Sequence, residues 1–433
     1  MNQVKTNKIS SYALSLIAVA TLSCSSLSFG INIFAAINKN DHKRVKEILK
    51  YEGFDVNKAD NDGNTPLHWA CDNNNLDIVT LLLKSGAKKS VNITNDFLVR
   101  TPLHVICNKN NANIEIVKSL IPHCNKGYID KEDKAGFTPL YLACEKNNKN
   151  IVELLLKKGD KKSVNTPDLH DNTPLHVACN NNNKDMVKLL LENGAIESVN
   201  KVNSDNKTPL HIACENNNLA IVESLVKSLL ANGGFKESAN KSSNPDETIL
   251  LWACNNQNIN EKTLKLLLNY SAKESINKAN NSGYTPLFAA CERDNPKNVE
   301  LLLAFGADVN KADNDGMTPL NWACANNNLE IVKLLLVHGA KESINKANNY
   351  GWTPLFWACY NNNLEIVKLL LKSGADVDQK SLDAAQDKPE ILELLTLVQN
   401  YDKNIKTGEY FELPKATKMM RKITKSCSPL WMN

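Results

Sequence analysis

Residues 318–337 read TPLNWACANNNLEIVKLLLV, and this stretch contains the pattern that decides the fold. Thr318 can cap a helix with its hydroxyl, and Pro319 fits the first helical turn, where its missing N–H costs nothing. Leu, Ala and Cys then fall on one helix face at i, i+3 and i+4. The asparagine run ends this short helix, because asparagine adopts a left-handed backbone more readily than most residues. A second, strongly apolar helix follows. Neither helix can bury its apolar face alone, so neighbouring copies of the unit must stack.

The same phrase recurs nine times along the 433-residue chain. The intervals between successive copies are 33 to 40 residues. Self-similarity at a nearly fixed period indicates a repeat architecture. The copies begin at Thr65, Thr101, Thr138, Thr173, Thr208, Thr248, Thr285, Thr318 and Thr353.

These phrases closely resemble the ankyrin repeat, which has a TPLHxA signature and a period of about 33 residues. The resemblance covers residues 31–398. It implies an all-α fold, an ankyrin-repeat solenoid of stacked antiparallel helix pairs with β-hairpin fingers along one edge. We expect an N-terminal capping repeat at 31–60, nine repeats over 61–380, and a C-terminal cap or partial repeat at 381–398. In this family the His of TPLH supports hydrogen bonds within and between repeats, as we expect for His68, His104, His176 and His211.

Departures from the pattern predict local differences. Several units replace the familiar ending at 306–310 with one that is two residues longer, such as 339–345, which should lengthen the loop before the next finger. The 40-residue interval contains a unit that lacks the finger glycine and has Ile249 where the helix-starting proline is expected. Residues 230–250 are therefore predicted to form a bend or a weak seam.

The two ends of the chain differ from the repeats. Residues 1–30 combine a basic start, an apolar run at 12–22 and small residues before Gly30, which predicts a secretory signal peptide. Cleavage is expected after Gly30 or after Ser28; lipid attachment at Cys24 and an uncleaved segment remain alternatives. The apolar run is far shorter than the roughly 20 residues of a membrane span.

Residues 399–433 form a basic tail that carries the whole net charge of +4. The rest of the chain is neutral, which argues against a nucleic-acid partner. The tail could contain a basic helix at 415–425 that contacts a membrane surface, although a tail that is flexible or folds over the last repeat fits better. We expect a monomer.

Nine cysteines occupy the same position in successive repeats, where we expect them to serve as small core-packing residues. Adjacent cysteines of the repeat position should lie about 8–10 Å apart, beyond the about 7 Å Cα separation that a disulfide tolerates. They also lack zinc-site spacing. No metalloprotease, P-loop or dinucleotide motif is present, so we expect no enzyme activity, no cofactor, no metal and no small-molecule substrate. The asparagine runs recur at turns and are expected to be structural. The nine cysteines are Cys71, Cys107, Cys144, Cys179, Cys214, Cys254, Cys291, Cys324 and Cys359.

Aromatic residues mark the candidate partner-binding surface. Four of the six tryptophans occupy one repeat position, on a stripe that the family pattern turns toward the concavity. Trp and Tyr often carry much of the energy of protein interfaces. The alternative is that these rings only cover gaps between helices. The candidate residues are Trp69, Trp252, Trp322, Trp352, Trp357 and Tyr360.

The resemblance therefore implies a non-catalytic protein–protein interaction scaffold with a protein partner of unknown identity. The leader and the unpaired thiols fit a secreted effector that reaches a reducing compartment and binds a host protein through its concave face. Two alternatives remain: a scaffold of the bacterial envelope or periplasm, and an inhibitor or regulator of the producer's own enzymes.

Overall fold

A computed structural model of the protein describes residues 32–231, 248–270 and 273–407, without the side chains of 273–274 and 401–407. The predicted leader at 1–30, most of the predicted seam at 230–250 and the end of the tail lie outside the described residues. The chain divides into two compact units. The first contains the described residues up to 106 together with 115–123, and the second contains 107–114 and the described residues from 124 onward.

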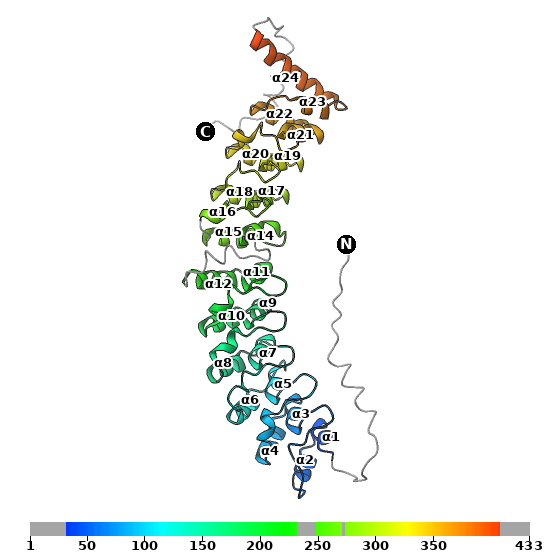
Figure 1. Ribbon diagram of the computed structural model, residues 1–433, viewed down its shortest axis with the longest axis vertical. Coiled ribbons are helices and arrows are strands. Elements are labelled where there is room, and N and C mark those ends of the chain that lie inside the picture. Colours follow the sequence, from blue (N-terminus) through cyan, green and yellow to red (C-terminus); the bar gives the residue numbers. More distant parts are fainter. Residues whose placement is uncertain (1–31, 232–247, 271–272, 408–433) are drawn as a thin grey trace. The chain divides into compact units, whose positions relative to one another are not determined.

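Each repeat phrase forms a short inner helix that begins at its proline or the equivalent residue, and a longer outer helix follows. Figure 1 shows the two rows of helices within each unit. The inner helices are α1 (Ile33–Asn38), α3 (Pro66–Asp72), α5 (Pro102–Cys107), α7 (Pro139–Glu145), α9 (Pro174–Asn180), α11 (Pro209–Glu215), α14 (Ile249–Asn255), α17 (Pro286–Glu292), α19 (Pro319–Ala325), α21 (Pro354–Tyr360) and α23 (Gln379–Ala384). The outer helices are α2 (His42–Ile48), α4 (Leu76–Lys84), α6 (Ile114–Leu120), α8 (Lys149–Lys158), α10 (Lys184–Glu192), α12 (Leu219–Ala231), α15 (Glu261–Tyr270), α18 (Pro296–Ala304), α20 (Leu329–Val337), α22 (Leu364–Lys372) and α24 (Pro389–Thr407).

Helices of the same row pack against one another. In the first unit α1 packs on α3 and α2 on α4. In the second unit α7, α9 and α11 pack in succession, as do α14, α17, α19, α21 and α23. The outer helix α12 packs on α15, so the two parts of this unit are in contact beside the undescribed segment. The Leu, Ala and Cys of the inner helices are buried. The thiols of Cys107, Cys144, Cys179, Cys214, Cys254, Cys291, Cys324 and Cys359 form no disulfide.

The three asparagines of each run have three different structural roles. Asn361 donates from Nδ2 to the carbonyls of Cys324 (3.0 Å) and Ala325 (2.7 Å) in the preceding repeat. Asn362 has φ of +55° and reverses the chain. Asn363 caps α22 by accepting from the Ile366 N–H at 3.0 Å, while its Nδ2 donates to the preceding repeat. The prediction that these runs are structural is confirmed. Equivalent runs lie at 73–75, 181–183, 216–218 and 326–328.

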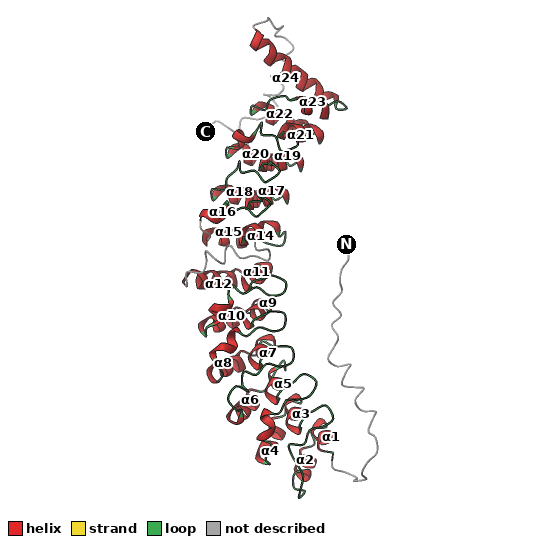
Figure 2. Cartoon of the chain, viewed as in Figure 1, coloured by secondary structure: helices red, strands yellow, loops and turns green. Residues whose placement is uncertain are grey.

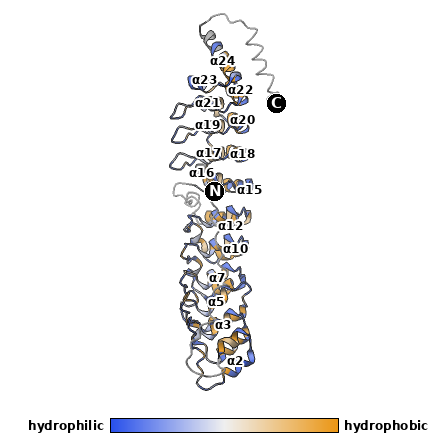
Figure 3. Cartoon of the chain, turned by 90° about the vertical axis from the view of Figure 1, so that its right-hand side faces the viewer, coloured by the Kyte–Doolittle hydropathy of each residue, from blue (hydrophilic) through white to orange (hydrophobic). Residues whose placement is uncertain are grey.

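The fingers are tight loops that project beyond the inner helices (Figure 3). In one finger the Asp313 N–H donates to the Met317 carbonyl at 3.0 Å, and Gly316 has φ of +76°. Successive fingers are joined by backbone bonds, such as Asn314 N–H to Ser282 O at 3.1 Å. Within residues 32–231, 248–270 and 273–407 no residue belongs to a strand, because each finger is too short to extend its hairpin-type pairing into a ladder (Figure 2).

The two-residue insertion does not form a longer loop, and that prediction is wrong. It forms one extra helical turn instead, since the turn buries side chains that a loop would expose. Ser343 and Ile344 illustrate this, with 1% and 6% of their surface exposed. The turns are η1 (Lys89–Asn92), η3 (Lys161–Asn165), η4 (Ala195–Ser198), α16 (Lys273–Ile276) and η5 (Ala340–Ser343); a further short turn, η2 (Ile121–His123), follows α6.

The second unit ends differently from the other repeats. Only residues 373–377 separate α22 from Asp378, the N-cap of α23, whereas residues 338–352 separate α20 from Thr353, the N-cap of α21. The α23–α24 pair therefore lacks a finger. Helix α24 continues beyond residue 398 to Thr407. In the part of the chain that the structure describes, no helix combines the length and the apolar character that a membrane crossing needs.

Candidate partner-binding surface

In several repeats the third residue of the inner helix links its repeat to the next finger. His68 Nε2 lies 2.9 Å from the Arg100 carbonyl, and His176 Nε2 lies 3.1 Å from the Lys207 carbonyl. Nδ1 of each ring accepts from the N-cap threonine, for example from Thr173 N–H at 3.1 Å. Burial lowers the pKa of both imidazoles to about 4, so they are neutral at physiological pH. The bonding role within and between repeats that the family resemblance implied is confirmed for His68 and His176, and the bond within the repeat also for His104 and His211.

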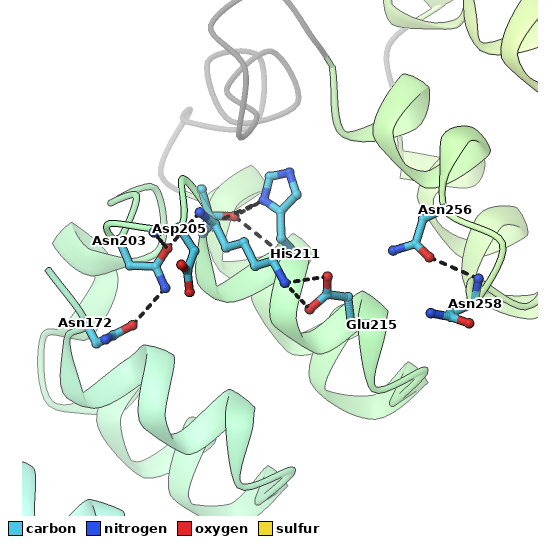
Figure 4. Close-up of polar contacts among 9 residues, drawn as sticks. Asn172, Asn203, Asp205, His211, Glu215, Asn256 and Asn258 are labelled. Carbon is cyan, nitrogen blue, oxygen red and sulfur yellow. Dashed lines mark hydrogen bonds and ion pairs between the residues drawn. The ribbon is translucent and has the colours of Figure 1, made fainter. Parts of the chain in front are cut away.

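His211 is the exception in this series. Its Nδ1 lies 2.7 Å from the Thr208 hydroxyl, but its Nε2 has no partner in the described residues (Figure 4). The residue directly before Thr248, at the position equivalent to Arg100 and Lys207, lies outside the described residues. The edge of the ring instead meets Trp252, with centroids 4.7 Å apart and planes at 80°. Burial lowers the pKa of His211 to about 3.

Figure 4 also shows the polar surface beside His211. Lys207 Nζ pairs with Glu215 at 2.7 Å, and Asn203 Nδ2 donates to Asn172 Oδ1 of the preceding finger at 2.8 Å. The charges of Lys207 and Glu215 therefore neutralise each other.

The predicted tryptophans fall in different surroundings. Trp69, in the first unit, donates from Nε1 to Asp60 Oδ2 at 2.8 Å and lies near Phe34. Trp252 is only 9% exposed and packs on His211, which favours the packing alternative for this residue. Trp322 meets Phe288 edge to face, with centroids 5.6 Å apart. No ring contact joins Trp252 to Trp322 among the described residues.

The other three predicted residues come together on α21 and the finger before it. We name the group formed by Tyr350, Trp352, Phe356, Trp357 and Tyr360 the C-terminal aromatic cluster. Trp352 stacks on Phe356 with centroids 5.3 Å apart and planes at 6°, and it meets Trp357 edge to face at 5.1 Å. Tyr350 stacks on Trp352 at 5.1 Å, and Tyr360 lies 6.1 Å from both Phe356 and Trp357. The two tyrosines are 62% and 61% exposed.

Two members of the cluster were absent from the sequence prediction. Phe356 occupies the position that His68 and His176 hold in other repeats, and Tyr350 lies at a finger tip. The sequence reads TPLF at 353–356 where other repeats read TPLH, and this change could have identified Phe356 as a candidate. Tyr350 could be added only once the fold placed the finger tip beside the inner helix.

The indole nitrogen of Trp357 has no acceptor in the described residues. In the first unit the equivalent nitrogen of Trp69 bonds to the Asp60 carboxylate. The residue at the Asp60 position is here Asn348, whose Oδ1 already accepts from the N–H groups of Tyr350 (3.0 Å) and Trp352 (2.9 Å). The aromatic rings of this repeat are thus held by packing more than by hydrogen bonds.

The cluster is exposed because the next helix pair has no finger. In the repeat before it, the finger that precedes α21 reaches back over α19, and the Trp352 carbonyl accepts from Asn321 Nδ2 at 3.2 Å. The α23–α24 pair places no such loop over Phe356. It contacts the α21 repeat instead through Asp378, which accepts from the Thr353 hydroxyl at 2.8 Å, and through Lys380, which donates to the Tyr350 carbonyl.

A shallow cavity of about 300 Å³ lies at the turn between α14 and α15, next to the turn between α17 and α18. It is lined mainly by polar side chains, including Asn256, Arg293 and Lys297. Across residues 32–231, 248–270 and 273–407, no three His, Cys, Asp or Glu residues come close enough to hold a metal ion. The C-terminal aromatic cluster is therefore the stronger candidate site.

Comparison with known proteins agrees with this architecture. The chain matches the family described as ankyrin repeats (3 copies) over residues 22–95, 88–168, 160–235, 223–313 and 305–381. It is 50% identical to ankyrin repeat domain-containing protein 49 of Drosophila melanogaster over 52 residues, which are 12% of this chain and 24% of that protein. It is 32% identical to an ankyrin repeat protein of fowlpox virus over 117 residues, which are 27% of this chain and 76% of the viral protein.

The chain belongs to the ankyrin-repeat family, and its fold is an all-α repeat solenoid. It spans about a quarter or less of the first relatives that it matches. Ankyrin repeats form protein–protein interaction scaffolds, so a protein partner is implied without its identity.

Proposed function

We propose that this chain is a non-catalytic binding protein that holds a partner protein through the C-terminal aromatic cluster. One observation carries the proposal: five aromatic rings touch one another on a single repeat, and the tyrosines at both ends are more than half exposed. Single exposed apolar residues are normal on protein surfaces, whereas a contiguous patch marks an interaction site. Trp and Tyr also supply a large contact area with few rotatable bonds.

A further exposed apolar side chain at another finger tip supports a binding surface that extends along the fingers. Leu169, at the tip of a finger in the second unit, is 71% exposed. Finger tips and inner helices together form the surface that ankyrin arrays use. A partner that spans several fingers would contact Leu169 as well as Tyr350.

We also propose that the protein is secreted and acts on a host protein. The leader-like residues 1–30 support this proposal, as do the eight buried cysteines from Cys107 to Cys359 that form no disulfide, because such cysteines suit a reducing destination. Cell fractionation tests it directly. Protein confined to the envelope of the producing cell would favour the envelope scaffold instead.

Affinity capture followed by quantitative mass spectrometry tests the binding site. The bait is residues 31–433, compared with a Tyr350→Ala/Tyr360→Ala variant and with Tyr51→Ala, a matched control that removes a half-exposed tyrosine from the first unit. Far-UV circular dichroism and melting temperature must be unchanged in both variants. We expect at least one protein to be captured by the parent and the control but lost by the double variant.

Lysates of host cells and of the producing cell are used in parallel. A cluster-dependent partner found only in the producing cell would support a regulator or scaffold of its own proteins. Identical captured proteins for all three baits would refute the aromatic cluster as the binding site.

A further inference from the structure

The C-terminal end of the second unit presents an aromatic surface without the finger that covers the equivalent position in other repeats. Phe356 and Trp357 are half-buried, and Tyr360 is mostly exposed. The chain beyond Thr407 continues for 26 residues. This segment begins on the same helix pair that lacks the finger.

The charges of the two regions are complementary. Residues 373–398, which include α23 and the first half of α24, contain six acidic and two basic residues. Of the acidic side chains, those of Asp376, Asp383, Asp387, Glu390 and Glu393 are exposed. Residues 408–433 contain five basic and two acidic residues. Opposite net charges favour an encounter between segments that are already linked.

The apolar composition of the segment also suits an aromatic surface. It contains Met419, Met420, Leu430 and Trp431 among its basic residues. Methionine sulfur packs favourably against aromatic rings, and lysine or arginine binds to ring faces through cation–π contacts.

The segment is long enough to reach the cluster. Helix α24 has 19 residues, so Thr407 lies about 28 Å along the helix from Pro389. A flexible chain of 26 residues spans on the order of 28 Å on average and about 86 Å when extended. Docking therefore requires no rearrangement of α23 or α24.

We propose that residues 408–433 dock on the C-terminal aromatic cluster of their own chain, with the basic side chains facing the acidic surface of α23 and α24. The tail takes the place of the missing finger. If the proposed function is correct, this segment and a partner protein bind to the same cluster. The docking itself does not depend on that partner.

Site-specific photo-crosslinking in the full chain tests the docking. A benzophenone amino acid replaces Tyr360 in the cluster or, as the control, Tyr51 in the first unit. We expect the probe at 360 to form an intramolecular crosslink that mass spectrometry maps to residues 408–433, and the probe at 51 to form none with that segment. A crosslink to a second copy, to the repeats alone, or no crosslink at position 360 would each overturn the proposal.

A charge variant of the tail provides the second measurement. Replacing Lys415, Lys418, Arg421, Lys422 and Lys425 by Gln leaves every described residue unchanged. We expect the yield of the crosslink from position 360 to fall at least threefold, and 0.5 M salt to lower it in the parent but not in the variant. An unchanged yield would show that charge does not direct the segment and would overturn the proposed arrangement. Because no partner is present, these results are separate from the capture experiment.

Discussion

The asparagine run at 361–363 predicts three different responses to substitution at three consecutive positions. Asn361→Ala removes two hydrogen bonds to carbonyls at the end of α19. At about 1 kcal/mol for each bond, the free energy of unfolding should fall by about 2 kcal/mol. Asn362 has φ of +55°, a left-handed backbone that asparagine tolerates better than alanine. Asn362→Ala should therefore lower the free energy of unfolding by about 1 kcal/mol. Asn362→Gly removes the steric strain, so its stability should lie within about 0.5 kcal/mol of the parent.

Urea unfolding followed by circular dichroism and tryptophan fluorescence measures these differences. Repeat proteins unfold by repeat as well as globally, so both signals must give the same order of stability before free energies are compared. The expected order is parent and Asn362→Gly together, then Asn362→Ala, then Asn361→Ala. A stable Asn361→Ala variant, or Gly as costly as Ala at position 362, would refute the assignment of separate roles.

Substitutions at three further sites test the packing of the repeats. Burial lowers the pKa of His176 from its ordinary value of 6.5 to about 4. Between these pH values the unfolded chain binds a proton that the folded chain does not. The free energy of unfolding should therefore fall by up to about 3 kcal/mol as the pH falls from 6.5 to 4. His176→Asn, which copies the residue present in the repeat at 318–324, should reduce this loss, and melting curves at pH 7.5 and 4.5 that shift equally in both proteins would contradict the reasoning. Cys324→Ser should be less stable than Cys324→Ala in urea titrations, because a hydroxyl replaces a thiol in an apolar site; the reverse order would argue against an apolar role for the thiol. Gly283→Ala should lower the melting temperature more than Gly53→Ala. Both glycines have positive φ, but only a Cβ at position 283 would clash with the backbone, at 2.7 Å from the Asn314 nitrogen. Equal shifts in melting temperature would count against this clash.

Local signals in the sequence were sufficient for the repeat architecture. A typical inner helix begins at Thr-Pro, ends at asparagine and buries a Leu-Ala-Cys face. These features depend only on residues within one unit, and each follows directly from the chemistry of those residues. The inserted turn was predicted incorrectly as a longer loop. Its helical form depends on burying Ser343 and Ile344, which is a property of the folded stack rather than of the insertion.

The candidate site was predicted only in part for a related reason. Repeat position identified Trp322 and Trp357 as equivalent, but the structure places Trp322 against Phe288 and Trp357 among four exposed or half-buried rings. Contacts between residues of different repeats and fingers do not follow from position within the unit. The exposure of the cluster depends on the missing finger before α23, a deletion that becomes meaningful only when the helices are placed.

A titration of purified full-length chain with the partner recovered by capture tests the central claim most directly. Isothermal titration calorimetry would compare the parent, the Tyr350→Ala/Tyr360→Ala variant and the Tyr51→Ala control. An interface centred on the C-terminal aromatic cluster predicts a loss of at least about 2 kcal/mol in the double variant, which is roughly a 30-fold weaker Kd, and no change in the control. Dissociation constants within twofold of one another for all three proteins would contradict the account.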